Sequence, residues 1–202
     1  ENVISGDYEL SRPFSYVTRR SGDFKDEKNE QLVVAFLDYL NNSIEGREAV
    51  AAEGGIVNLD GAKPWSELKA NHSILEEDNS DVVISLGGST SVEETIVSAY
   101  ESFIPFTNGA SFESNLTGSG DGYKRVLGEE KDSANYADIG FASRDFKAEE
   151  DVSKALDSGV YCKDAIVVVV SKDFAEDNTN LTKEQVYNIF TGEITTWDMV
   201  EK

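Results

Sequence analysis

The apolar residues of this chain alternate between short strand-like runs and longer helical patterns. A buried-strand run spans 81–88 and ends in two glycines, and residues 89–103 then repeat apolar positions at helical spacing. Residues 111–118 alternate like a strand, 136–143 form another short apolar run, and 164–171 are rich in β-branched side chains. This alternation predicts an α/β fold, a mostly parallel sheet flanked by helices.

The first part of the chain has a different pattern. Residues 8–17 read as a strand, in which Pro13 indicates an edge or crossing position. Apolar positions along 29–42 share one helical face, and a second helix should end at the glycines of 44–55. Residues 60–80 are polar and mixed, which predicts a linker holding one short helical turn.

Two further helices are predicted late in the chain. One is a helical stretch around 147–156. The other, 181–192, is amphipathic, with Thr182 as its N-cap and Gly192 as its stop. Between them, the run at 164–171 is long enough for a fully buried strand.

Composition narrows the function classes. The 202 residues include 18 Lys and Arg against 39 Asp and Glu, a formal charge of -21. Nucleic acids and anionic membranes are bound by basic patches, so both are unexpected partners. The lone Cys162 cannot form an internal disulfide or a cysteine-cluster metal site. His72 lies in the predicted linker, where we expect it to be solvent exposed.

Ser, Thr and Gly recur at three points where a predicted strand stops and a helix begins. The turns read GGSTSV at 87–92, GSGDG at 118–122 and ASR at 142–144. A helix N-terminus carries unpaired N–H groups and about half a positive charge, so it holds an anion without Lys or Arg. Such turns gather at the carboxyl ends of parallel strands. Together they predict one anion pocket.

Each turn also has a purely structural interpretation. Ser91 followed by Glu94 has the spacing of a capping box. Ser119 equally fits an ordinary glycine-rich turn, and Arg144 fits a surface ion pair. The acidic groups nearby indicate solvated faces rather than metal ligands.

Several segments together resemble a known family. In order and approximate spacing, five of them are similar to the first half of bacterial phosphate-binding proteins, the solute receptors of ABC-type phosphate uptake systems: GSTSV (88–92), GSGDG (118–122), ADIGFASRDFKAEE (137–150), KDAIVVVV (163–170) and LTKEQVYNIFTGEITTWD (181–198). Residues 8–17, with 33–59 behind them, resemble the final segment of the same family.

Members of this family have two lobes, of which lobe one is made from both ends of the chain and lobe two from its middle. The resemblance implies one lobe of this type II periplasmic-binding-protein-like fold, in permuted segment order. The implied parts are a family C-terminal segment completing lobe one (1–59), a linker (60–80), a family N-terminal segment forming the core of lobe one (81–180) and the start of the second lobe (181–202). The strands at 8–17 and 164–171 would cross the hinge. The family's middle portion, with the Arg and Ser-Gly-Thr motif of the opposing lobe, has no counterpart here. The order fits a fragment of tandem copies or an engineered circular permutation.

Site residues follow from the resemblance position by position. Ser91 matches a phosphate-contacting hydroxyl, Val92 a backbone N–H donor and Ser119 a second hydroxyl, with Thr90 and Gly120 as their neighbours. The implied mechanism is capture of inorganic phosphate between closing lobes and delivery to a membrane permease. The implied location is extracellular or at the cell surface, periplasmic or lipoprotein-anchored in the full-length protein.

One implied site residue departs from part of the family. Arg144 falls where some relatives place an Asp that accepts the proton of hydrogen phosphate, while others have Ser-Arg as here. In such a site a carboxylate that accepts this proton rejects sulfate, because the oxygens of sulfate carry no proton at neutral pH. Selectivity for phosphate therefore follows from the family rather than from these residues.

Three alternatives stand beside a receptor that acts alone. An enzyme such as a phosphohydrolase needs a metal cluster or a nucleophile with a base, and the sequence predicts neither these nor a cofactor. A phosphate-sensing or interaction module with the same fold, without transport, stays an alternative. Self-association that completes the cleft is a further possibility, because half a cleft leaves a bound anion exposed.

Overall fold

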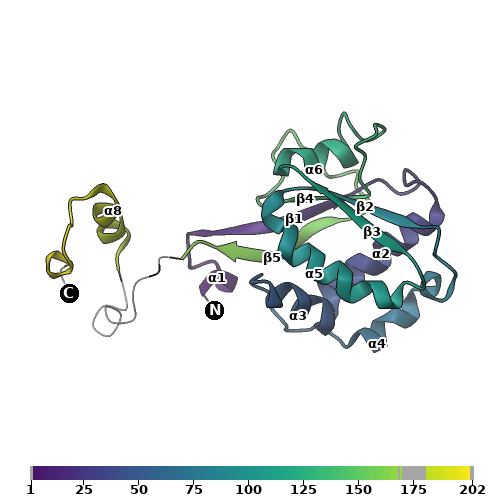
Figure 1. Cartoon of the computed structure of the whole chain (residues 1–202), viewed down its shortest axis with the longest axis horizontal. Coiled ribbons are helices and arrows are strands. Elements are labelled where there is room, and N and C mark those ends of the chain that lie inside the picture. Colours follow the sequence, from purple (N-terminus) through teal and green to yellow (C-terminus); the bar gives the residue numbers. More distant parts are fainter. Residues whose placement is uncertain (1, 168, 170–180, 201–202) are drawn as a thin grey trace. The chain divides into compact units, whose positions relative to one another are not determined.

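The computed structural model describes residues 2–167, 169 and 181–200. The chain divides into two compact units, one up to Ile166 and one from Val167 onwards. The larger unit is built around a five-stranded sheet in the order β3-β2-β4-β1-β5 (Figure 1). Its strands are β1 (Ser11–Thr18), β2 (Val83–Gly88), β3 (Ser111–Leu116), β4 (Ile139–Ala142) and β5 (Ser158–Ala165).

Strand directions confirm the predicted sheet class. β2 pairs in parallel with both β3 and β4, while β1 is antiparallel to both β4 and β5. β1 is therefore the strand that runs against the other four. Pro13 lies in the part of β1 that pairs with β5 and extends beyond the end of β4. Its missing N–H therefore breaks no hydrogen bond to β4.

Helices cover both faces of this sheet (Figure 1). The helices of this unit are α1 (Asn2–Ser5), α2 (Glu27–Asn42), α3 (Ile44–Ala52), α4 (Trp65–Leu68), α5 (Glu93–Phe103) and α6 (Ser119–Val126), with 3-10 turns η1 (Lys69–Asn71), η2 (Ser73–Glu76), η3 (Thr90–Val92) and η4 (Ile104–Phe106). Asp26 caps α2 and Ser43 caps α3, each accepting a backbone N–H from the first turn. None of the described helices has the length and apolar character needed to cross a bilayer.

Two apolar clusters lie on opposite sides of the sheet. The smaller joins Val17 of β1 to Val126 and Leu127 at the end of α6. The larger contains Tyr16 of β1 together with side chains of α2 and α5. Neighbouring residues of a strand point to opposite faces, so Tyr16 and Val17 separate the clusters. The strands β1, β2 and β4 are thus buried on both faces, as expected of a mostly parallel sheet, whereas the edge strand β3 is largely exposed.

The segment 60–80, predicted as a polar linker with one short helical turn, is mostly exposed but packs the side chains of Trp65 and Ile74 into the core. Trp65 is fully buried and its ring lies 5.2 Å from that of Tyr39 and 5.8 Å from that of Phe103. The prediction that His72 is solvent exposed was also wrong. Its ring stacks on Trp65 at 5.7 Å, and its Nε2 lies 2.7 Å from a carboxylate oxygen of Asp38. The segment's role as a joint between family segments stays a prediction.

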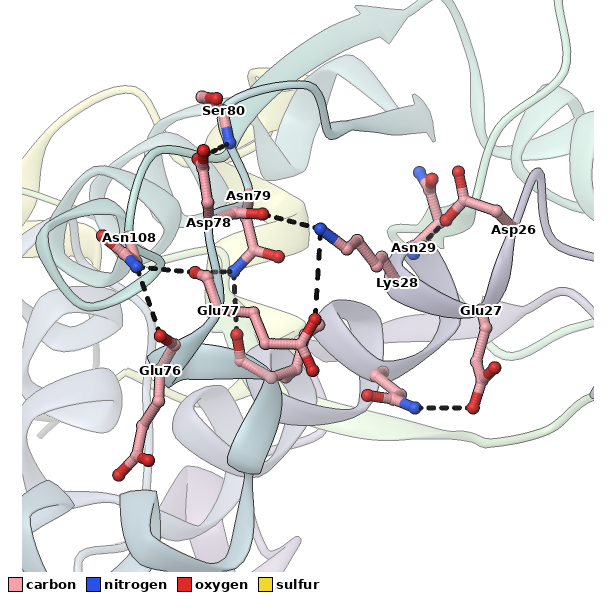
Figure 2. A network of polar contacts seen from close by, with 12 residues as sticks. Asp26, Glu27, Lys28, Asn29, Glu76, Glu77, Asp78, Asn79, Ser80 and Asn108 are labelled. Carbon is pink, nitrogen blue, oxygen red and sulfur yellow. Dashed lines mark hydrogen bonds and ion pairs between the residues drawn. The ribbon is translucent and has the colours of Figure 1, made fainter.

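Polar contacts fasten the end of this segment to α2 (Figure 2). The Nζ of Lys28 donates to the carbonyl of Asp78 at 2.6 Å and lies 4.0 Å from the carboxylate of Glu77. The buried Asn79 donates through Nδ2 to the carbonyls of Ile74 and Thr107, each at 2.8 Å. These bonds fix the approach of the chain to β2.

Two other predicted elements differ in the structure. The stretch 147–156 forms turns instead of a helix, with backbone hydrogen bonds that join residues three apart, from Glu150 to Lys147 and from Ala155 to Val152. The strand predicted at 164–171 begins earlier, as β5, and ends at Ala165. Ile166, Val167 and Val169 are 65%, 63% and 82% exposed, so the described part of this run is not a fully buried strand. Residues 168, 170 and 171 lie outside the described residues.

The smaller unit confirms the predicted late helix. Its helix α8 (Lys183–Thr191) is capped by Thr182, which forms a capping box with Gln185. Gly192 ends the helix in the left-handed conformation, with φ of 81°. A 3-10 turn, η5 (Trp197–Met199), follows.

Candidate anion-binding site

The three predicted turns lie at one edge of the sheet. In the strand register, Gly88 at the end of β2 pairs with Leu116 of β3 and with Phe141 of β4. The residues that follow these strands therefore leave the sheet side by side. The carbonyl of Gly88 ties two of the turns together, because it accepts the N–H groups of Thr117 and Gly118 at 2.7 and 2.8 Å.

Close backbone packing at this edge requires glycine. Gly88 has φ of 126°, in the region that L side chains rarely adopt, and a Cβ there would collide with the backbone of Phe141. A Cβ at Gly122, in α6, would also collide with the backbone of Phe141. The glycines let β2 and α6 approach the end of β4.

Three serine hydroxyls meet where these turns converge. The Oγ of Ser89 donates to the Oγ of Ser143 at 3.1 Å, and the Oγ atoms of Ser119 and Ser143 lie 3.2 Å apart. The backbone N–H of Ser143 also donates to Ser119 Oγ, at 3.1 Å. Ser89, Ser119 and Ser143 form what we call the three-serine cluster. Each serine comes from a different strand end, so the cluster exists only in the folded chain.

The cluster stands at the starts of helical segments. Ser119 opens α6, and Ser89 caps η3, which runs directly into α5. The first N–H groups of a helix have no partner within the helix and carry partial positive charge. Hydroxyls and helix starts thus present donors to the same edge.

Of the residues singled out in the sequence, those around η3 are placed as follows. Thr90 and Ser91 are exposed, whereas the Val92 side chain is buried, so Val92 can face a ligand only through its backbone. The capping-box interpretation of Ser91 was wrong. Ser89 is the capping residue, accepting the N–H of Ser91 at 3.2 Å, and α5 starts after Val92 without a side-chain cap.

The remaining predicted residues divide between the cluster and the surface. Ser119 belongs to the cluster, and Gly120 follows it in the first turn of α6. Arg144 instead forms an ion pair with Glu150, whose two carboxylate oxygens lie 2.7 and 2.9 Å from its Nη1 and Nη2. The hydrogen bond from Arg144 lowers the pKa of Glu150 and raises that of Arg144.

Sequence reasoning did not single out two members of the cluster, Ser89 and Ser143. Both lie inside turns that the sequence did identify. The residue types and their spacing located these turns but did not indicate which hydroxyls within them would meet. Sequence reasoning also missed Arg12 of β1, whose Nη1 lies 3.5 Å from Ser143 Oγ. Nothing local in the sequence joins residue 12 to residue 143.

Other reactive groups lie apart from this edge. The thiol of Cys162 is buried, which raises its pKa to about 12 and keeps it protonated at neutral pH. Within the described ranges, no group of three or more His, Cys, Asp or Glu side chains is placed to hold a metal ion.

Comparison with known proteins gives several matches. A family model described as a PBP superfamily domain matches residues 73–201. The chain is 28% identical over 202 residues to the Phosphate-binding protein PstS 2 of Streptococcus agalactiae, and 25% identical over 201 residues to the protein of the same name from Streptococcus pneumoniae. Each alignment covers 100% of this chain and 60% of the relative. The chain therefore spans about three fifths of the length of these relatives.

A solved structure has the same fold. It is the crystal structure of a phosphate ABC transporter, phosphate-binding protein from Streptococcus pneumoniae, which matches with a TM-score of 0.72 at 24% identity, over 99% of this chain and 67% of that chain. Since the family model matches well over half of the sequence, this chain belongs to the PBP superfamily.

Proposed function

We propose that this chain is a lobe of an extracellular solute-binding protein that captures inorganic phosphate for uptake by an ABC transporter. The observation that carries the proposal is the three-serine cluster, in which the hydroxyls of Ser89 and Ser119 lie 3.1 and 3.2 Å from that of Ser143. A tetrahedral oxyanion needs several convergent donors. The phosphate-binding relatives supply independent support.

The donors at this edge suit an anion in a strongly acidic protein. A chain with a formal charge of -21 repels anions at long range, so its anion site must act at short range. Hydroxyls and helix N–H groups do so without adding counter-charge. In the proposed complex, Ser89, Ser119 and Ser143 turn their O–H groups from one another towards the phosphate oxygens.

The residues carried over from the family complete this proposal. The Ser91 hydroxyl is exposed beside the cluster, and the Val92 N–H lies at the junction of η3 and α5, where it makes a long hydrogen bond of 3.4 Å to the carbonyl of Ser89. Thr90 and Gly120 adjoin these donors. Arg144, held by Glu150, contributes positive charge at the rim of the site and no direct contact.

Transport is the broader part of the proposal. The chain covers 60% of its curated relatives, so the opposing wall of a binding cleft belongs to a second lobe. Phosphate delivery to a permease and an extracellular location follow from the same proposal. Binding without catalysis is supported by the relatives, which are binding proteins by name. The permuted order and self-association stay predictions from the sequence.

The test is isothermal titration with phosphate and, separately, sulfate, on the wild-type chain, on Ser119→Ala and on Ser66→Ala. Ser66 is an exposed serine of α4, outside the cluster, and serves as the matched control. Loss of one hydroxyl that bonds a charged ligand should weaken phosphate binding by about tenfold or more. Ser66→Ala should bind as wild type does.

The same titration separates the alternative functions. Saturable phosphate heat that Ser119→Ala diminishes supports a receptor or phosphate sensor, and preference over sulfate supports the uptake role. Wild-type protein that binds neither anion contradicts phosphate capture by this chain and favours an interaction module with the same fold.

A further inference from the structure

We propose that Arg12 is an anion-contacting residue of this site and that Asp164 is its positioning residue. The inference rests on the proposed function, because it assigns a cationic contact to the phosphate held by the three-serine cluster. It starts from strand geometry. β1 pairs with β4 only from Ser15 onwards, but its pairing with β5 begins at Ser11. The start of β1 and the end of β5 therefore extend past β4, on the side where the cluster lies.

The guanidinium of Arg12 is divided between two partners. Its Nε and Nη2 donate to one oxygen of Asp164 at 2.9 and 2.8 Å. Its remaining nitrogen, Nη1, lies 3.5 Å from the Oγ of Ser143, which is a long hydrogen bond. The carboxylate thus holds one edge of the guanidinium and directs Nη1 to the cluster.

Other contacts keep this arrangement in place while leaving it open to solvent. The guanidinium carbon lies 5.5 Å from the centre of the Phe14 ring, whose side chain is buried. The side chain of Arg12 is 41% exposed and that of Asp164 is 31% exposed. An anion that reaches the cluster can therefore also reach Nη1.

Comparison of the two arginines near the cluster distinguishes their roles. Arg144 has both terminal nitrogens on Glu150, and its Nη1 also donates to the carbonyl of Asp145, so both N–H groups of that nitrogen are engaged. Arg12 has Nη1 on a hydroxyl that the proposed ligand would itself engage. A phosphate oxygen bound beside Ser143 replaces the long contact between Arg12 Nη1 and Ser143 Oγ with a charge-assisted hydrogen bond to Arg12. Arg12 needs no rearrangement away from Asp164 for this step.

The experiment is a phosphate titration at two salt concentrations on wild type, Arg12→Gln, Asp164→Asn and Arg20→Gln. Arg20 is exposed just beyond the opposite end of β1 and controls for the loss of one positive charge. Arg12→Gln should weaken phosphate binding about tenfold or more and reduce its salt dependence. Asp164→Asn keeps an acceptor oxygen for Nε and Nη2 but removes a negative charge near the anion, so affinity should rise. Asp164→Ala removes the same charge together with the acceptor and should bind phosphate more weakly than Asp164→Asn. Equal affinities for these two variants overturn the positioning role of Asp164. Arg20→Gln should remain within about twofold of wild type, as a distant screened charge does.

The outcomes separate this inference from the proposed function. Wild-type binding that Ser119→Ala weakens but Arg12→Gln leaves unchanged overturns the role of Arg12 alone. Equal losses for Arg12→Gln and Arg20→Gln also overturn it, since only net charge would then matter. No phosphate binding by wild type contradicts the proposed function and this inference with it. Circular dichroism of each variant identifies any that fails to fold, and Arg12→Lys, which keeps the charge but not the divided contacts, then takes the place of Arg12→Gln.

Discussion

Two regions of the larger unit are held together by different interactions: the aromatic core formed mainly by α2 and α5, and the three-serine cluster at the edge of the sheet. In the core, Phe36, Tyr39, Trp65 and Phe103 are fully buried, and their rings pack edge to face or tilted at 5.2–5.8 Å. At the edge, hydroxyls bond mainly to one another and to backbone. Burial stabilises the first region. The second uses polar groups that a ligand can take over.

This difference indicates a division between stability and binding. Core side chains gain free energy by leaving water, whatever binds elsewhere. The serine hydroxyls gain little from bonding to one another, because water would serve them nearly as well. Substitutions in the core should therefore change unfolding and leave phosphate affinity intact, and substitutions at the edge should do the reverse.

The largest effect is expected at Trp65. Trp65→Ala should lower the free energy of unfolding by about 3–5 kcal/mol, because it leaves a cavity among the rings of Tyr39 and Phe103. Urea denaturation measures this. Trp65→Phe is the matched control and should cost much less, since it keeps an aromatic ring and removes the buried Nε1–H that has no partner. Equal losses for the two variants would show that ring packing is not what stabilises this region.

A smaller effect, with opposite sign, is expected at Asp138 beside β4. Its side chain is fully buried, one oxygen accepts the N–H of Ser85 at 2.8 Å, and the other oxygen has no partner. Burial raises its pKa to about 6, while Arg19 and other groups act to lower the pKa. A raised pKa means that the folded state favours the protonated acid. The contribution of this group to the free energy of unfolding is then greatest below about pH 4 and is lost as the pH rises through about 6.

Asp138→Asn should therefore stabilise the protein at pH 7.5, by up to about 3 kcal/mol, and flatten this part of the pH profile. Thermal unfolding between pH 4 and pH 8 measures both effects. Asp81→Asn, at an exposed aspartate before β2, corrects for the general relief of negative charge. If both variants change the profile equally, burial of Asp138 is not the cause.

The smallest effect is expected at Arg144, which follows Ser143 of the cluster but is held by an ion pair with Glu150. Arg144→Gln removes a partly exposed ion pair with Glu150 and should cost less than about 1 kcal/mol of stability. Since the proposed role of Arg144 is through its charge alone, phosphate affinity should fall no more than about threefold. A double-mutant cycle with Glu150→Gln measures the pair, and titration measures the affinity. A tenfold loss of affinity would place Arg144 in direct contact with the anion.

Much of the fold could be predicted from the sequence because its strands and helices carry regular apolar patterns. β2 and α2 follow such patterns closely, and so does α8 with its capping residue. β5 was misplaced because Ser158–Ala165 has no continuous apolar run and gains its order by pairing with β1. Trp65 was missed as core because its sequence neighbours are polar.

The site was predicted only in part, for a similar reason. Glycines and serines mark each turn locally, so the three turns could be identified. Which hydroxyls meet depends on the strand register, which sets Gly88 beside Phe141. Arg12 and Ser143 are brought together by a sheet in which β1 lies between β4 and β5. Local patterns contain no information on that order.

The central claim is that phosphate binds at the three-serine cluster, and a phosphate titration followed through backbone amide resonances tests it most directly. We predict saturable shifts confined to 88–92, 118–120 and 142–144 and to the neighbourhood of Arg12, with sulfate producing weaker ones. The aromatic core should be unaffected. Saturable shifts that map elsewhere, or no shifts at millimolar phosphate, would contradict the account.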